Sequence, residues 1–386
     1  MGGIEFHLLV HPPPTPVPSV VAGLVAIFLA VLILPLVVKK IEENLEYFFF
    51  CMGVIAFLLV YLHGMVPKPL ELWRDALLAP VMISGIPIGI TQVVLFAGLA
   101  FYFLYPTFYR GLLEMIEKLG IMVFVTLFIS FLGLVSSIIS VIVASVILAE
   151  IVYALPIDRS EKLDLAVYGC FAIGLGAALT PVGEPLATIA VSKLSGPPYH
   201  AGFAFLLKLL GDLVIPGIIA IAVFTGLLAR KHHSVVAEFV AVEKARSEPV
   251  KYPERLRDIV IRAFKVYVFV AALELLGNSF IPLTVWYFSK IPALILYWVN
   301  MISAVVDNAT LTAAEIGPHM TLAQIKSALM GLLISGGMLI PGNIPNIVAA
   351  GRLKISSREW ARRGVPFGII LLVVYFMILL AMYGWH

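Results

Sequence analysis

Two apolar segments, Ile121–Leu155 and Leu283–Gly317, are too long to cross a membrane as single straight helices. An α-helix rises about 1.5 Å per residue, so each segment would measure about 52 Å against a hydrocarbon core of about 30 Å. Each carries a polar cluster near its centre. We predict that each folds as a re-entrant hairpin of two shorter helices that meet at a polar tip. The tips contain Ser136, Ser137 and Ser140 in the first segment, and Ser303, Asp307 and Asn308 in the second.

The composition places the whole chain in a bilayer. Of 386 residues, 61% are hydrophobic and 13% are charged, whereas about 25% of the residues of soluble domains are charged. We therefore expect an all-α polytopic membrane protein with the lipid bilayer as its partner. Six segments have the length of single spans: Val20–Val38, Tyr47–Val66, Ile86–Tyr105, Gly202–Leu228, Ile259–Ile281 and Pro366–Trp385.

Two more apolar segments, Leu163–Leu194 and Lys326–Leu353, are interrupted by proline and glycine. The interruptions read TPVGEP from Thr180 and PGNIPN from Pro341. Breaks of the helix inside a membrane are tolerated where the freed backbone groups line a cavity or bind an ion. We predict a discontinuous transmembrane helix in each segment.

These features occur twice in the same order. SSIIS at 136–140 matches SAVVD at 303–307, and GAALTPVGE at 176–184 matches GGMLIPGN at 336–343 with one gap. The chain is therefore divided into N-terminal scaffold spans (1–85), a first repeat (86–229; hairpin 121–155, broken helix 163–194), a cytoplasmic linker (230–258) and a second repeat (259–386; hairpin 283–317, broken helix 326–353).

The distribution of basic residues gives the orientation. With both long segments re-entrant, 20 of the 26 Lys and Arg residues fall on one side, which the positive-inside rule makes cytoplasmic. Both termini are then extracytoplasmic, in the plasma (inner) membrane. The two repeats have opposite orientations, and inverted repeats with broken helices are a recurring architecture of secondary transporters.

The motifs resemble those of a known group. SAVVDNATLTAA from Ser303 is similar to the serine-to-aspartate-asparagine motif of the ion transporter superfamily, and TPVGEP and IPGNIPN are similar to its paired unwound segments. That superfamily includes sodium/proton antiporters, arsenite permeases and divalent-anion/sodium symporters. The resemblance covers about residues 86–386. It implies a scaffold domain, often dimeric, and a transport domain, so we expect a homodimer.

Within that superfamily the acids favour a cation. Symporters for divalent anions carry Ser-Asn-Thr at both tips, whereas the first tip here has no asparagine and the second contains an acid. An acid in the apolar segment around Asp307 costs about 2.5–3.5 kcal/mol on insertion scales, which indicates a functional role. In the implied fold a tip and a helix break meet near the midplane, where Asp307 and Glu184 would hold sodium. The other expected binding residues are Asn308, Ser303, Asn343, Thr180, Ser136, Ser140 and Asn346.

Sodium and a proton would compete for the same oxygens, because burial and a neighbouring like charge both favour the neutral form of a carboxyl group. We therefore expect a sodium/proton antiporter whose substrates are a small inorganic cation and the proton, with no cofactor. Structural alternatives remain open at four positions. Glu184 could cap the half-helix that begins at Pro185, Asp307 could cap a helix, and Asn343 and Asn346 could merely satisfy the broken helix.

Three further polar residues lie in predicted spans. Lys208 and Asp212 are four residues apart and are expected to pair, and Glu274 lies one turn from Asn278. Each pair could be structural or could relay protons. Glu150 and Glu315, near the hairpin ends, are expected to be interfacial.

Other classes of function fit less well. An aspartyl protease needs a second aspartate motif besides Gly211-Asp212, and a zinc enzyme needs histidines at depth, so we expect no enzyme. We expect no nucleic-acid partner. A sodium-coupled organic anion (dicarboxylate-like) symporter, an arsenite permease and a cation channel remain alternatives.

Overall fold

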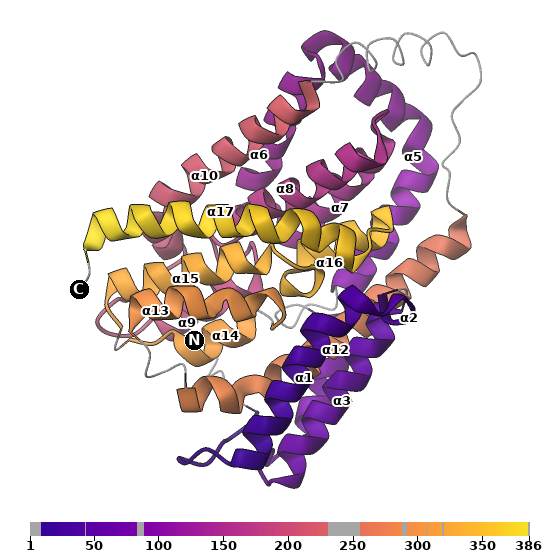
Figure 1. Ribbon diagram of the computed structural model, residues 1–386. Coiled ribbons are helices and arrows are strands. Elements are labelled where there is room, and N and C mark those ends of the chain that lie inside the picture. Colours follow the sequence, from indigo (N-terminus) through magenta and orange to yellow (C-terminus); the bar gives the residue numbers. More distant parts are fainter. Residues whose placement is uncertain are drawn as a thin grey trace.

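The computed structural model describes residues 9–42, 44–82, 89–230, 255–287, 292–306, 308–318 and 320–384. These residues form helices, turns and loops, and no strand occurs among them (Figure 1). The predicted all-α class is therefore confirmed. Most of the predicted linker, 230–258, lies outside the described residues.

The N-terminal part forms a separate packed group. It comprises α1 (Pro18–Val37), α2 (Lys39–Glu42), α3 (Leu45–Leu62) and α4 (Pro69–Leu78). Helix α3 packs against α1 and, more extensively, against α12 (Leu256–Tyr287), which also contacts α4. Figure 1 shows α1, α3 and α12 side by side at the lower right.

The first predicted repeat contains six helices: α5 (Ile90–Leu119), α6 (Ile121–Ile139), α7 (Val141–Ala154), α8 (Arg159–Ala177), α9 (Pro185–Lys193) and α10 (Phe205–Ala229). The expected break of the first long segment occurs at Ser140, whose φ of 74° is left-handed. Helix α6, with 19 residues, is long enough to cross a bilayer by itself, whereas α7, with 14 residues, is not.

The second predicted repeat, 259–386, begins within α12. It contains α13 (Ala293–Val299), the 3₁₀ helix η3 (Asn300–Ala304), α14 (Asn308–Glu315), α15 (Leu322–Gly336), the 3₁₀ helix η4 (Ile340–Gly342), α16 (Ile344–Leu353) and α17 (Ser357–Tyr383). Both predicted discontinuous helices are interrupted as expected, between α8 and α9 and between α15 and α16.

One predicted boundary is wrong. Helix α12 continues through Pro282 to Tyr287, so Leu283 does not begin a hairpin; a proline removes one backbone donor and kinks a helix, but packing can hold the helix together. Helix α5 bends by 80° between Ile90–Leu104 and Tyr109–Leu119.

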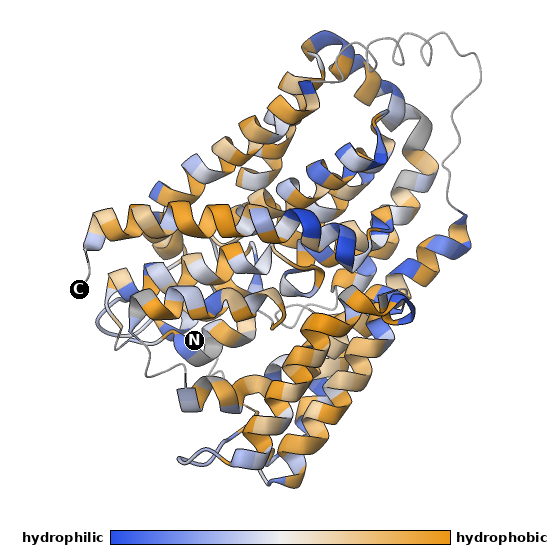
Figure 2. Ribbon diagram, viewed as in Figure 1, coloured by the Kyte–Doolittle hydropathy of each residue, from blue (hydrophilic) through white to orange (hydrophobic). Residues whose placement is uncertain are grey.

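The surface fits a lipid environment. Five of the described helices, α1, α3, α6, α10 and α17, are long and apolar enough to span a membrane, and the bent α5 makes a sixth if it counts as one span. Figure 2 shows long hydrophobic stretches on these helices. On α17 one side is exposed and apolar, including Ile370, Val374 and Met377. The protein is therefore a polytopic membrane protein.

Helices from the two predicted repeats pack in matching pairs. Helix α6 contacts α8, and α13 contacts α15. Across the repeats, α7 contacts α16, and α14 contacts α9. Helix α10 packs against α8, and α17 packs against α15. Figure 1 shows α16 close to α7 although they are far apart in the sequence.

Close backbone approach fixes the first break. A Cβ atom at Gly176, in α8, would lie 1.7 Å from the carbonyl oxygen of Gly133 in α6. A Cβ atom at Gly183, in the break itself, would lie 1.9 Å from the carbonyl oxygen of Ala177. Neither neighbour is a flexible side chain, so only glycine fits at these two positions.

We predict that Gly176→Ala lowers the free energy of unfolding by about 1–3 kcal/mol or more, because α6 and α8 must separate to admit the methyl group. Thermal unfolding of purified protein in detergent measures this. The matched control is Gly111→Ala in α5, where an added Cβ has no neighbour within 4 Å. Equal stability of the two variants would contradict the packing described for α6 and α8.

Candidate functional site

Glu184 is buried at the first helix break. It is the N-cap residue of α9, with an extended backbone (φ −154°, ψ 160°), and its side chain makes no capping hydrogen bond. Only 5% of Glu184 is exposed. The Glu184 side chain is therefore buried within the protein, and the structure does not support the alternative of a side-chain cap on α9.

The tip between α6 and α7 is bound directly to this break. The backbone N–H of Val141 donates to the carbonyl of Gly183 at 2.7 Å, and the hydroxyl of Thr180 donates to the carbonyl of Ser137. Ser136 is fully buried and donates to the carbonyls of Gly133 (2.7 Å) and Ile173 (3.1 Å). Thr180 and Ser136 are thus brought to the break as predicted, but their hydroxyl hydrogens are used by backbone carbonyls.

The second break has a similar backbone and different side chains. Asn343 is the N-cap residue of α16, with φ −155° and ψ 152°, and its Oδ1 accepts from the N–H of Ile344. Asn346 is fully buried, and its Nδ2 donates to the carbonyls of Gly336 (2.7 Å) and Leu339 (2.8 Å). Both asparagines therefore satisfy the interrupted helix, which is the structural alternative considered for them. The Oδ1 atom of Asn346 is buried and has no hydrogen-bond partner among the described residues.

The second tip also lies at its break. Ser303 is fully buried and donates to Oδ1 of Asn308 and, at 3.3 Å, to the carbonyl of Leu332. A Cβ atom at Gly336 would lie 2.6 Å from Nδ2 of Asn308. That Nδ2 atom is buried without a partner in the described part of the chain. Asp307, the residue between this tip and α14, lies outside the described residues.

The two breaks are neighbours in space. A Cβ atom at Gly174, near the end of α8, would lie 2.8 Å from Nδ2 of Asn343. Gly337, at the end of α15, lies against the ring of Phe171 in α8. The structure thus brings Glu184, Asn343, Asn346, Ser303 and Asn308 into one region around the ends of α8 and α15. We call this region the break site.

Ser140 and the predicted relay residues are arranged differently. Ser140 is the partly exposed residue at which α6 ends and α7 begins. Glu274 is half-buried in α12, where its Oε1 accepts from Nδ2 of Asn278 at 3.0 Å, as the helical spacing predicts.

The predicted pairing of Lys208 with Asp212 is wrong. Asp212 instead binds Lys326 of α15, with Nζ–O distances of 2.6 and 2.7 Å. The Lys326 side chain is only 3% exposed, so its charge requires a counterion, whereas Lys208 is exposed. Asp212 and Lys326 therefore join α10 to α15.

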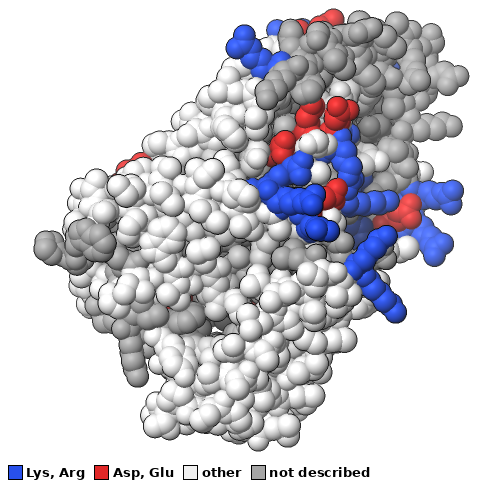
Figure 3. Space-filling model, viewed as in Figure 1, with Lys and Arg blue, Asp and Glu red and all other residues white. Residues whose placement is uncertain are grey.

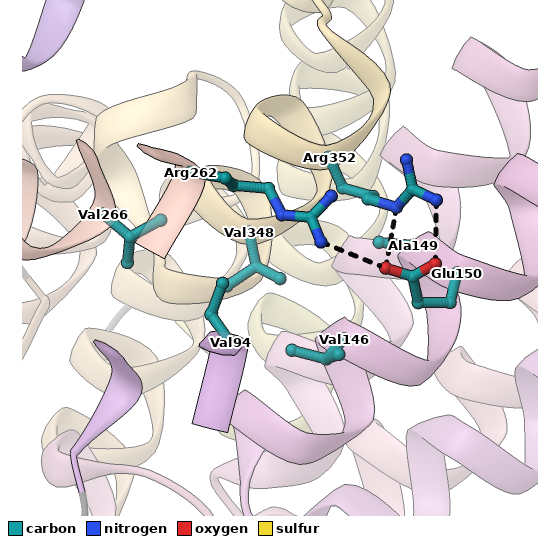
Figure 4. Close-up of a pocket in the computed structure, with 8 residues that line it drawn as sticks. All are labelled: Val94, Val146, Ala149, Glu150, Arg262, Val266, Val348 and Arg352. Carbon is teal, nitrogen blue, oxygen red and sulfur yellow. Dashed lines mark hydrogen bonds and ion pairs between the residues drawn. The ribbon is translucent and has the colours of Figure 1, made fainter. Parts of the chain in front are cut away.

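A second buried charged group was missed by sequence reasoning. Glu150, expected to be interfacial, is 3% exposed and binds Arg352 through two hydrogen bonds of 2.7 and 2.9 Å. Arg262 of α12 reaches the same carboxylate at 3.5 Å (Figure 4). The guanidinium carbon of Arg352 lies 3.5 Å from the centroid of the Tyr153 ring.

The Glu150 cluster leaves little free space. Its cavity measures about 10 Å³ and is otherwise lined by Val94, Val146, Ala149, Val266 and Val348, and about 10–15 Å³ is the least that holds one water molecule. The cluster therefore acts as a buried ion pair between α7 and α16. The sequence did contain a signal for this pair: Glu150 and Arg352 are charged residues within apolar helices, and a charge in such a helix requires a partner.

Glu315 was also expected to be interfacial and is buried instead, with 5% exposed. Its Oε2 atom accepts from Nδ2 of Asn300 at 3.0 Å. The described part of the chain contains no group of three or more His, Cys, Asp or Glu side chains that could hold a metal ion.

The family of the chain is shown by its sequence. A family model described as "Protein of unknown function (DUF1646)" matches residues 21–382. The chain therefore belongs to the DUF1646 family. A comparison with curated proteins finds no match.

We predict that Arg352→Met lowers the free energy of unfolding by about 3–5 kcal/mol, because it leaves the carboxylate of Glu150 buried without its main partner. Chemical or thermal unfolding in detergent measures the loss. Lys68→Met is the control: Lys68 and Glu71 form an exposed pair, and removing it should cost about 0–1 kcal/mol. A small loss for Arg352→Met would mean that the pair does not hold α16 on α7.

Proposed function

We propose that the protein is a secondary transporter of the ion transporter superfamily that exchanges sodium for protons at the break site. The observation that carries this proposal is the burial of Glu184 in an interrupted helix, at a place where a second interrupted helix lies alongside. Buried acids within transmembrane segments mark ion and proton pathways, and interrupted helices are the usual position of transporter sites.

Helix packing supports two inverted repeats within this transporter. Two pairings in the first repeat have counterparts in the second: α6 with α8 corresponds to α13 with α15, and α8 with α10 corresponds to α15 with α17. If α6 to α10 correspond in order to α13 to α17, the contact of α7 with α16 corresponds to the contact of α14 with α9. In this scheme, α6–α7 and α13–α14 are the re-entrant hairpins and α1, α3 and α4 belong to a scaffold that forms a homodimer.

The ion pairs support the proposed orientation. Arg159–Glu359, Arg363–Asp164 and Lys265–Glu46 each join residues assigned to the cytoplasmic side. Lys326–Asp212, in contrast, joins two residues near the outer ends of their helices. Figure 3 shows Lys and Arg side chains gathered, with Asp and Glu among them, at one end of an otherwise largely uncharged face. This is the asymmetry that the positive-inside rule expects at the plasma membrane.

The chemistry of the break site suits a small hard cation. Carboxylate, amide and backbone oxygens are the ligands that such ions prefer. Glu184 supplies the charge, Asn346 has a buried oxygen without a partner among the described residues, and the sequence adds Asp307. A proton on Glu184 removes the charge that attracts sodium, so one carboxyl group can bind the two ions in turn.

One observation favours a second candidate, a sodium-coupled anion symporter. Helices α7, α9, α14 and α16 all begin at the tips and breaks, and helix N-termini attract anions. Flux measurements with a panel of cations and dicarboxylates separate the two candidates. An antiporter changes the internal pH on addition of sodium alone, whereas a symporter requires the anion.

We predict that Glu184→Gln reduces sodium-driven proton flux at least tenfold in proteoliposomes loaded with a pH-sensitive dye, because the neutral amide can neither release a proton nor attract sodium. The control is Glu71→Gln in α4, which replaces an exposed acid far from the breaks in the sequence and should keep wild-type flux. Full exchange by a folded Glu184→Gln variant would remove Glu184 from the mechanism.

A further inference from the structure

Glu315 and Asn300 form an isolated polar pair in the interior of the second repeat. Asn300 is 0% exposed and Glu315 is 5% exposed. The two Nδ2 hydrogens of Asn300 are both used, one by Oε2 of Glu315 at 3.0 Å and the other by the carbonyl of Ala328 at 3.2 Å. Oδ1 is therefore the one side-chain atom of Asn300 that remains available for a hydrogen bond.

Two buried oxygen atoms of this pair remain without a hydrogen bond. Oε1 of Glu315 and Oδ1 of Asn300 each have no partner among the described residues. Both are acceptors when the carboxyl group is ionised, so neither can satisfy the other. A protonated carboxyl group, in contrast, has one O–H donor, and a hydrogen bond from Oε1 to Oδ1 would satisfy both atoms.

The charges on the surrounding helices do not neutralise Glu315. Helices α9, α12 and α15 pack against α14. Their charged residues are Lys193 on α9, Lys326 on α15, and Arg257, Asp258, Arg262, Lys265 and Glu274 on α12. No ion pair within the described residues joins Glu315 to a lysine or arginine, and Lys326 is bound to Asp212. An ionised carboxylate in this position would be buried without a counter-charge, which is strongly unfavourable.

Glu150 provides the contrast within the same molecule. It occupies a comparable place on α7, facing α16, and two arginines bind its carboxylate. On the matching pair of α14 and α9, the basic residue near the end of α9 is Lys193, and no ion pair connects it with Glu315 among the residues that the structure describes. Glu150 is thus held in its charged form, whereas Glu315 has the surroundings of a neutral acid.

We propose that Glu315 and Asn300 form a proton-binding site, in which the carboxyl group is protonated at Oε1 and donates to Oδ1 of Asn300. The resulting ring contains two hydrogen bonds, one in each direction between the acid and the amide. A sodium ion fits less well, because it needs several oxygens and one amide N–H of Asn300 already points at the carboxylate. The site is separate from the break site and does not depend on sodium exchange.

The test uses the full-length protein in detergent at neutral pH. Glutamine at position 315 presents an acceptor oxygen and an N–H donor where the protonated acid has its oxygen and O–H. Glu315→Gln should therefore keep the Tm of the wild type or raise it. Glu150→Gln, the matched control, should show a clear loss of Tm, because it leaves Arg352 and Arg262 without their counterion. A loss of Tm in Glu315→Gln comparable to that in Glu150→Gln would overturn the proposal.

Infrared spectroscopy gives an independent readout of the proton. The wild-type spectrum should contain a protonated-carboxyl stretching band that is absent from Glu315→Gln and unchanged in Glu71→Gln. Asn300→Leu should keep this band and shift it to higher frequency, since the bond to the amide oxygen is lost. A Glu315→Gln variant that loses carboxylate absorption instead would show that Glu315 is ionised. Neither measurement involves ion flux. A negative result would therefore not bear on the proposed sodium/proton exchange, which the flux experiment tests separately.

Discussion

Backbone groups freed inside the membrane must find partners within the protein, and the arrangement at the break site follows from that constraint. Where α15 ends, the amide of Asn346 donates hydrogen bonds to the carbonyls of Gly336 and Leu339, and the indole N–H of Trp360 donates to the carbonyl of Gly337. At the first break, the backbone N–H of Val141 donates a hydrogen bond to the carbonyl of Gly183. The first two residues satisfy carbonyls of the second break, and the Val141 bond holds the first tip against the first break. The requirement that stabilises the interrupted helices thus also helps to assemble the polar region around Glu184.

Buried charge is distributed unevenly around this region. The buried Glu150 is bound by Arg352, and the buried Lys326 is bound by Asp212, whose own side chain is 50% exposed. These pairs join α7 to α16 and α10 to α15. Glu184 and Glu315 are equally buried, but Glu184 lies where helices are interrupted and Glu315 has an amide as its neighbour. We infer that the first two acids have structural roles and that the last two exchange protons, with sodium competing only at Glu184.

The sequence predicted the helix breaks well, because the signals are local. Proline, glycine and polar residues interrupt apolar runs at Thr180 and Pro341, and the structure interrupts its helices there. Long-range partners could not be predicted in the same way. Glu150 and Arg352 are 202 positions apart, and Asp212 binds Lys326 rather than Lys208 because only burial, which depends on the whole fold, decides which lysine needs a counterion. The arrangement at Asp307, central to the predicted site, lies outside the described residues.

The central claim is that one buried carboxyl group binds sodium and a proton in turn. Sodium binding to the purified protein, measured by calorimetry in buffers of different ionisation enthalpy, tests it most directly. The account predicts that binding sodium releases a proton to the buffer and that the affinity for sodium falls as the pH is lowered. Sodium binding with no proton release and the same affinity at every pH, or no binding of sodium at all, would contradict it.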